Sequence, residues 1–301
     1  MNISQDNSNN NNLKVGLIAT MPRSGTWYNH YFFYFYDGIL NGHTEFSFEL
    51  PKDKVGVIRN IDLDAFLICH SVCLGFYKYH GQYREVWDKL NFYVDGYNWA
   101  KNIIDSNIRH FDPSLNADVK IVYLYRNPLD QAVSFFRHAQ KHKDQRHMQY
   151  KDRFGNTCAI KTLQEFIFNI GLESYIKQFL TFKVMKDIYS HNILTVKYEE
   201  LVRKPEQIFK KILNHFGHNI DNEMKASAFQ TALKLSRMDS MKKIEDKIGH
   251  SLGDDQADTN EKHVRDGKIG KWKTHFNNED IARIEKRLNN FDLSLAQFDI
   301  E

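Results

Sequence analysis

The sequence has few of the features that mark secreted, disulfide-bonded or membrane-spanning proteins. Only three of its 301 residues are cysteines, namely Cys69, Cys73 and Cys158. Three cysteines cannot all pair with one another, and the first two have no companion Cys or His pair at zinc-site spacing. We therefore expect reduced thiols in a cytoplasmic protein. No apolar run approaches the roughly 18 residues that a membrane-spanning helix needs, so the sequence predicts no membrane partner.

Charge and terminal composition exclude further classes. The net charge is +3, from 41 Lys and Arg against 38 Asp and Glu. This balance is too weak to indicate nucleic-acid binding, and the basic segment 141–153 carries no RNA- or DNA-binding motif. Residues 1–13 are polar and rich in Asn, without the basic-then-apolar order of a signal peptide. We expect this segment to be a disordered tail.

The remaining residues, 14–301, are predicted to form one α/β domain. Their length suffices for a single large core, and no repeat or linker rich in Pro and Ser divides them. Short apolar runs with β-branched residues predict buried strands of a mostly parallel sheet flanked by helices. These strands are expected at 15–19, 64–70, 119–125 and 192–197.

Helical periodicity predicts the elements that cover this sheet. The first helix is expected from Trp27, with Asp37-Gly38 as its end signal. The residues between 236 and 276 are expected to be irregular. The other helices are predicted near 97–111, 127–142, 163–189, 205–216, 221–235 and 278–290.

The loop Pro22-Arg23-Ser24-Gly25-Thr26 lies between the first strand and the first helix. Such a junction binds phosphate, because the first-turn N–H groups and the helix dipole both point toward an anion. It is not a Walker A loop, since it lacks the Gly-Lys-Ser/Thr ending. A P-loop kinase or NTPase remains an alternative, as does an ordinary turn with a helix cap.

The third strand ends at Arg126, where a P-loop kinase would be expected to carry a magnesium-binding Asp. Asn127-Pro128 then begins a helix that carries Ser134 two turns later. A guanidinium at a strand end and a nearby hydroxyl form a second candidate phosphate site. Two such sites suit a nucleotide phosphorylated at both its 3′ and 5′ positions. The alternative is a surface Arg and a helical Ser.

Two further positions have the chemistry of a site. His70 ends the second strand, and catalytic groups of open α/β sheets gather at the carboxyl ends of strands, although a structural His is the alternative. The loop 265–273 reads RDGKIGKWK. Its glycines, separated by cations, allow the backbone to approach an anion closely.

Four motifs occur in the order and spacing of one family. PRSGTWY is similar to a PKSGTTW loop, LYRNPLDQAVSFF to CRNPKDVAVSYY, VKYEELVRKP to YEDLKxDP, and RDGKIGKWKTHF to RKGxxGDWKxHF. On these motifs the chain, from Lys14 to Phe276, resembles the cytosolic-type sulfotransferases that use 3′-phosphoadenosine-5′-phosphosulfate (PAPS). The resemblance implies a P-loop-like nucleotide fold and sulfuryl transfer to a hydroxyl or nitrogen of a small-molecule acceptor. It also implies adenosine 3′,5′-bisphosphate (PAP) as the product, no metal, no nucleic-acid partner, and a monomer or homodimer.

The resemblance also assigns roles to individual positions. The residues expected at the 5′-phosphosulfate are Arg23, Ser24, Gly25, Thr26 and Trp27. The residues expected at the 3′-phosphate are Arg126, Ser134, Arg265, Asp266 and Gly267. The residues expected around the adenine are Tyr28, Tyr198, Ser236 and Met238. His70 is the expected general base, and Arg23 stands at the position of the family's catalytic lysine.

Three departures from the family pattern indicate a divergent, non-animal branch. Arg23 keeps the charge of the lysine that it replaces but has a planar fork. Ile68 stands where the family has a second lysine, and Asp266 replaces a lysine of the late loop. A non-catalytic sulfotransferase-like binding protein is therefore a further alternative. The aromatic segment 76–99 suits a flat or apolar acceptor, and we expect a natural-product alcohol, phenol or amine.

Overall fold

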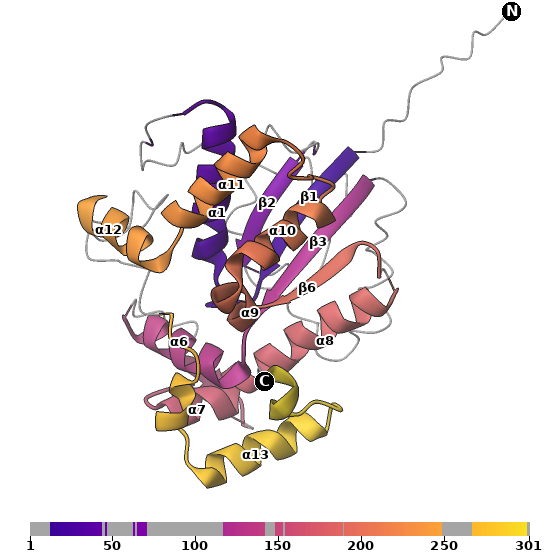
Figure 1. Cartoon of the computed structure of the whole chain (residues 1–301). Coiled ribbons are helices and arrows are strands. Elements are labelled where there is room, and N and C mark those ends of the chain that lie inside the picture. The colour runs from indigo at the N-terminus through magenta and orange to yellow at the C-terminus, as the bar shows by residue number, and fades with distance from the viewer. Residues whose placement is uncertain are drawn as a thin grey trace, which may run out of the picture.

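A parallel sheet forms the centre of the structure, with helices on both sides (Figure 1). The computed structural model describes residues 13–43, 46, 63, 65–70, 117–141, 148–152, 154–188, 190–248 and 267–299. Within these residues the main sheet has four strands in the order β2-β1-β3-β6, and each neighbouring pair is parallel. The strands are β1 (Leu13–Thr20), β2 (Ala65–His70), β3 (Ala117–Tyr125) and β6 (Ile193–Lys197). The four predicted strands and the α/β class are thereby confirmed.

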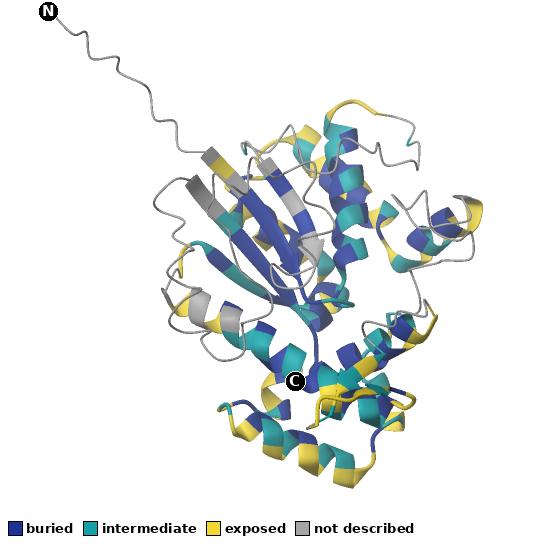
Figure 2. Ribbon diagram, turned by 180° about the vertical axis from the view of Figure 1, so that it is seen from behind, coloured by how far each residue is buried: buried dark blue, intermediate teal, exposed yellow. Residues whose placement is uncertain are grey.

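The central strand β3 shows why its sequence is apolar without interruption. Val122 and Leu124 are buried in one core with the first helix, whereas Tyr123 faces the other side. It stacks on Phe182 of α8 (Leu172–Ile188), with ring centroids 3.9 Å apart. Both faces of the strand are therefore covered, as in other parallel sheets. The view from behind shows the middle of the inner strands β1 and β3 in the colour of buried residues (Figure 2).

Aromatic packing joins the helices on one face of the sheet. Phe32 stacks on Phe209 at a centroid distance of 3.7 Å and meets Phe229 edge-on at 5.6 Å. These three rings belong to α1 (Thr26–Leu40), α10 (Pro205–His215) and α11 (Glu223–Leu235). The aromatic first helix is thus a core element, and its Phe32 is completely buried.

A second core lies beyond the carboxyl end of β3, where α6 and α7 pack with the C-terminal helix α13 (Figure 1). Its elements are α6 (Pro128–Lys141), α7 (Leu163–Phe166), the π-helical turn η4 (Ile167–Gly171), α8 (Leu172–Ile188), α13 (Asn278–Asn289) and η6 (Leu295–Phe298). The remaining elements are the hairpin of β4 (Gln149–Lys151) and β5 (Thr157–Ala159), α9 (Tyr198–Arg203), α12 (Met238–Ile248) and η5 (Lys271–Thr274). No helix in the described ranges combines the length and apolar character needed to cross a bilayer.

Two sequence-based expectations are wrong. The stretch predicted to be irregular begins with α12, whose Met241 and Ile244 lie at helical spacing and are buried in the core. The first helix also passes through Gly38 instead of ending there. A Cβ at Gly38 would come within 2.6 Å of the Phe46 ring, so this glycine permits close packing. The left-handed glycine beyond the helix end is Gly42, with φ 78°.

Candidate functional site

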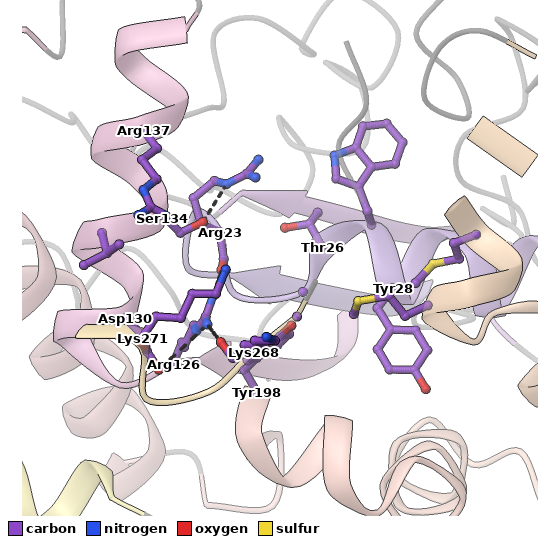
Figure 3. Close-up of a pocket in the computed structure, with 16 residues that line it drawn as sticks. Arg23, Thr26, Tyr28, Arg126, Asp130, Ser134, Arg137, Tyr198, Lys268 and Lys271 are labelled. Atoms are coloured by element: carbon purple, nitrogen blue, oxygen red, sulfur yellow. Dashed lines mark hydrogen bonds and ion pairs between the residues drawn. The ribbon is translucent and has the colours of Figure 1, made fainter. Parts of the chain in front are cut away.

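A cleft opens at the carboxyl edge of the sheet, between α1, α6, α9 and α12 (Figure 3). Part of the segment 267–275, which we call the late loop, also lines this cleft. The residues that line the cleft are Arg23, Gly25, Thr26, Trp27, Tyr28, Arg126, Asp130, Val133, Ser134, Arg137, Tyr198, Met238, Met241, Gly267, Lys268 and Lys271. Five of them are cations and one is a carboxylate, so the cleft is strongly positive.

The junction between β1 and α1 presents a helix N-terminus to this cleft. Gly25 caps the helix in a left-handed conformation, φ 96°, and no side chain caps the first turn. The first-turn N–H groups have no partner within the helix, which makes the junction favourable for an anion. A Cβ at Gly25 would come within 2.8 Å of the Tyr198 ring. Glycine is therefore required both by the conformation and by the ring beside it.

Arg126 follows β3 and lies at the floor of the cleft, 7% exposed. Its guanidinium lies over the Tyr198 ring at 4.6 Å and donates a 2.9 Å hydrogen bond to the carbonyl of Lys268. Two carboxylates flank it, Asp130 at 3.8 Å and Glu199 at 4.0 Å. This side chain therefore joins the sheet, α9 and the late loop.

Asp130 fixes the late loop against α6. Its two carboxylate oxygens accept the backbone N–H groups of Gly270, at 2.6 Å, and of Trp272, at 3.1 Å. Gly267, at the start of the loop, has φ 56°, and a Cβ there would overlap the Met238 side chain. One buried carboxylate thus places the backbone that brings Gly267 and Lys268 to the cleft.

The phenols and one carboxyl at the site have raised pKa values. Burial, together with the nearby Tyr198, raises the pKa of Tyr28 to about 12, and burial likewise raises the pKa of Tyr198. Both phenols are therefore neutral at pH 7. Burial also raises the pKa of Glu199, whose Oε1 accepts the N–H of Asn127 at 2.9 Å.

The structure brings most of the predicted site residues together. Those that line the cleft are Arg23, Gly25, Thr26, Trp27, Tyr28, Arg126, Ser134, Tyr198, Met238 and Gly267. Ser24 and Ser236 are fully buried and do not line it. The Ser236 hydroxyl donates to the carbonyl of Leu233 at 3.4 Å. Arg265, Asp266 and the aromatic segment 76–99 lie outside the described residues.

His70 is the last residue of β2, and its backbone pairs with Thr20 at the end of β1. Thr20 in turn forms a 2.6 Å hydrogen bond between its hydroxyl and that of Thr26, which lines the cleft. The His70 backbone therefore lies at the carboxyl edge of the sheet, where the cleft opens, while its side chain lies outside what the structure describes. Ile68, two residues earlier, is buried in the core.

Sequence reasoning missed several residues of the cleft. The sequence-based assignments give neither Asp130 nor Arg137 a role at the cleft. Their spacing from Ser134, four and three residues, places all three on one helical face, a signal that was available in the sequence. The other lining residues that were not predicted are Val133, Met241, Lys268 and Lys271. In the described ranges, no group of three or more His, Cys, Asp or Glu side chains is arranged to hold a metal ion.

Comparison with known proteins identifies the family. The family model described as "Sulfotransferase domain" matches residues 15–291. The chain belongs to the sulfotransferase family. The prediction from four short motifs is therefore confirmed at the level of the family.

The relatives of this chain are distant. Cytosolic sulfotransferase 16 of Arabidopsis thaliana is 25% identical over 179 residues, which cover 58% of this chain and 51% of the relative. Amine sulfotransferase of Oryctolagus cuniculus is 24% identical over 280 residues, covering 80% and 81%. The chain spans about half the length of the plant relatives that it matches. The low identities agree with a divergent member of the family.

Solved structures support the fold. A crystal structure of retinol dehydratase in a complex with retinol and PAP matches with a TM-score of 0.50 and 18% identity. The match covers 96% of this chain and 83% of that chain. At this identity the likeness concerns the arrangement of the sheet and helices.

Proposed function

We propose that this protein transfers a sulfuryl group from PAPS to a hydroxyl or nitrogen of a small-molecule acceptor. The observation that carries the proposal is the meeting of two phosphate-binding arrangements in one cleft. The uncapped N-terminus of α1 suits the 5′-phosphosulfate, and Arg126 with Ser134 suits the 3′-phosphate. The curated relatives carry names such as amine sulfotransferase and flavonol 3-sulfotransferase, which supports the same reaction class.

The residues present fit such a nucleotide. The Ser24 hydroxyl is buried without a hydrogen-bond partner among the described residues, as expected of a group that a bound ligand would satisfy. Gly25 and Gly267 have no side chain where the backbone must approach a phosphate. The five cations and one carboxylate of the lining give a net charge of +4. This charge complements a ligand that carries a phosphate and a phosphosulfate.

Each residue has a defined task in this proposal. PAPS, when bound, supplies the sulfuryl group on a good leaving group. Arg23 and the N-terminus of α1 stabilise the negative charge that develops on the leaving phosphate oxygen. His70 takes the acceptor proton as the new bond to sulfur forms, a contribution of roughly a hundred- to ten-thousand-fold in rate. Tyr28 and Tyr198 flank the adenine, near Met238 and Ser236.

We further propose a cytoplasmic protein that acts on a natural-product alcohol, phenol or amine, as a monomer or homodimer. Relatives described as cytosolic sulfotransferases support this location. The acceptor class rests on the aromatic sequence of 76–99 and on the small-molecule names of the relatives.

The decisive experiment compares two nucleotides by thermal shift and then measures turnover. At a hundred times its dissociation constant, PAP should add about 2.7 kcal/mol of stability, whereas ADP with magnesium should add little. The protein is then incubated with PAPS and a panel of phenols, alcohols and amines, and PAP release is measured. Stabilisation by ADP with magnesium alone would contradict the proposal in favour of a kinase. Tight PAP binding without turnover of any acceptor would favour the non-catalytic alternative.

A further inference from the structure

One face of α6 carries more charge into the cleft than the motifs indicate. Asp130, Ser134 and Arg137 follow one another at spacings of four and three residues, so they lie on the same side of the helix. All three line the cleft (Figure 3). Ser134 is half-buried and accepts a 3.4 Å hydrogen bond from the Arg23 Nε, while Arg137 is exposed at the mouth.

The charge of Arg126 is already offset by its surroundings. The Asp130 carboxylate lies 3.8 Å from its guanidinium and is almost fully buried, and Glu199 lies at 4.0 Å on the other side. One N–H group is also committed to the Lys268 carbonyl. A phosphate carrying close to two negative charges placed here therefore meets a nearly neutral group. Further cations are needed to hold it.

Arg137 has the donors that this phosphate needs. Its guanidinium lies 2.9 Å from the Nε2 of His275, the last residue of the late loop. Burial, with Arg137 and Lys271 nearby, lowers the pKa of His275, so its imidazole is neutral at pH 7 and its Nε2 accepts from the guanidinium. This is the one hydrogen bond that Arg137 makes with the described residues, and it leaves four N–H groups for a ligand.

We infer that Arg137, oriented by His275, binds the 3′-phosphate beside Ser134 and determines the preference for a 3′-phosphorylated nucleotide. This inference rests on the proposed function, because it takes PAP as the ligand. Arg137 is a binding residue in this role, and His275 is a positioning residue that acts through it. Lys271 lies between the two late-loop residues whose N–H groups donate to Asp130, and it adds positive charge to the cleft.

The test measures how well each variant distinguishes PAP from AMP, which lacks the 3′-phosphate. Dissociation constants are determined by isothermal titration calorimetry for the wild type and for Arg137→Gln, Arg137→Lys and Lys183→Gln. The last variant is the matched control, because Lys183 is an exposed cation on α8, which contributes nothing to the cleft. Arg137→Gln should weaken PAP binding by about tenfold to a hundredfold and change AMP binding less than twofold. Arg137→Lys should lie between the two, and Lys183→Gln should match the wild type.

Three outcomes separate this inference from the proposed function. A wild type that binds AMP as tightly as PAP would overturn both. If the wild type prefers PAP and Arg137→Gln weakens the binding of both nucleotides equally, the inference is overturned and the proposed function stands. The same holds if Arg137→Gln binds both nucleotides as tightly as the wild type does. The melting temperature of Arg137→Gln, expected to equal that of the wild type, shows that the exposed substitution leaves the fold intact.

The positioning role of His275 has its own readout. His275→Ala removes the acceptor and should lower the PAP preference, by less than Arg137→Gln does. His275→Gln retains a side-chain acceptor and should restore most of that preference. An alanine variant with the wild-type preference would remove His275 from this role.

Discussion

Gly25 should be the least replaceable residue of the cleft. Substitution by alanine places a Cβ in a left-handed conformation, at a cost of about 1–2 kcal/mol. The reduced entropy of the unfolded chain returns about 0.4–1 kcal/mol of this. The new methyl group would also lie 2.8 Å from Tyr198 Cδ2 and 3.4 Å from Leu124 Cδ2. Overpacking of this kind costs about 1–3 kcal/mol more.

Gly42 provides the matched control. It has φ 78°, and nothing lies within 4 Å of the Cβ that alanine would add. Gly42→Ala should therefore cost about 1 kcal/mol in free energy of unfolding. Gly25→Ala should cost about 2–4 kcal/mol, because it adds the contact with the Tyr198 ring. Urea unfolding of both variants measures the difference.

Binding gives a second, independent readout of Gly25→Ala. The Arg126 guanidinium lies over the Tyr198 ring at 4.6 Å, so a displacement of this ring also disturbs Arg126. The variant should therefore lose PAP affinity, while Gly42→Ala keeps it. Equal destabilisation of the two variants, together with unchanged PAP binding by Gly25→Ala, would refute the reasoning.

Three further predictions follow from the same contacts. His70→Ala should abolish sulfuryl transfer to any active acceptor while leaving the PAP dissociation constant within about twofold, and substantial remaining turnover would exclude His70 as the base. Asp130→Asn should lower the free energy of unfolding by about 1–3 kcal/mol, because an amide cannot accept both backbone N–H groups of the late loop; limited proteolysis should then cut that loop faster, and an unchanged rate would contradict this role. Burial lowers the pKa of His215 below 6.5, so between the folded and unfolded pKa values the folded state binds fewer protons than the unfolded state. The contribution of His215 to the free energy of unfolding is therefore present above pH 6.5 and lost as the pH falls through the folded pKa. His215→Gln should therefore flatten the urea-unfolding profile between pH 7 and 5 relative to the wild type, and parallel profiles would contradict the assignment.

The sheet could be predicted from the sequence because its strands are buried on both faces. β3 reads as an apolar run since Val122 and Tyr123 are both covered, one by each layer of helices. The helix α12 was missed because loop residues precede it and its apolar stripe is short. Gly38 was misread because a glycine that permits close packing looks, in sequence, like one that ends a helix.

The site was predictable where a motif is local and obscure where charges meet across the fold. The loop around Gly25 is predicted to be an anion site from seven consecutive residues. Asp130 belongs to a motif too, yet its two hydrogen bonds go to backbone groups 140 and 142 residues away. The guanidinium of Arg137 likewise contacts His275, 138 residues along the chain. The sequence pattern of a single helix does not indicate contacts with residues so far along the chain.

The sequence by itself determined the family and the parallel sheet and indicated the two segments proposed to bind phosphate, because these follow from local backbone preferences and from motifs of consecutive residues. Only the tertiary structure decided how the charges balance. It places Asp130 and Glu199 against Arg126, and, as far as the described residues go, it leaves Arg137 with unused donors at the mouth of the cleft. Electrostatic interaction depends on the distance between groups in space, and that distance is fixed by packing of elements far apart in the chain.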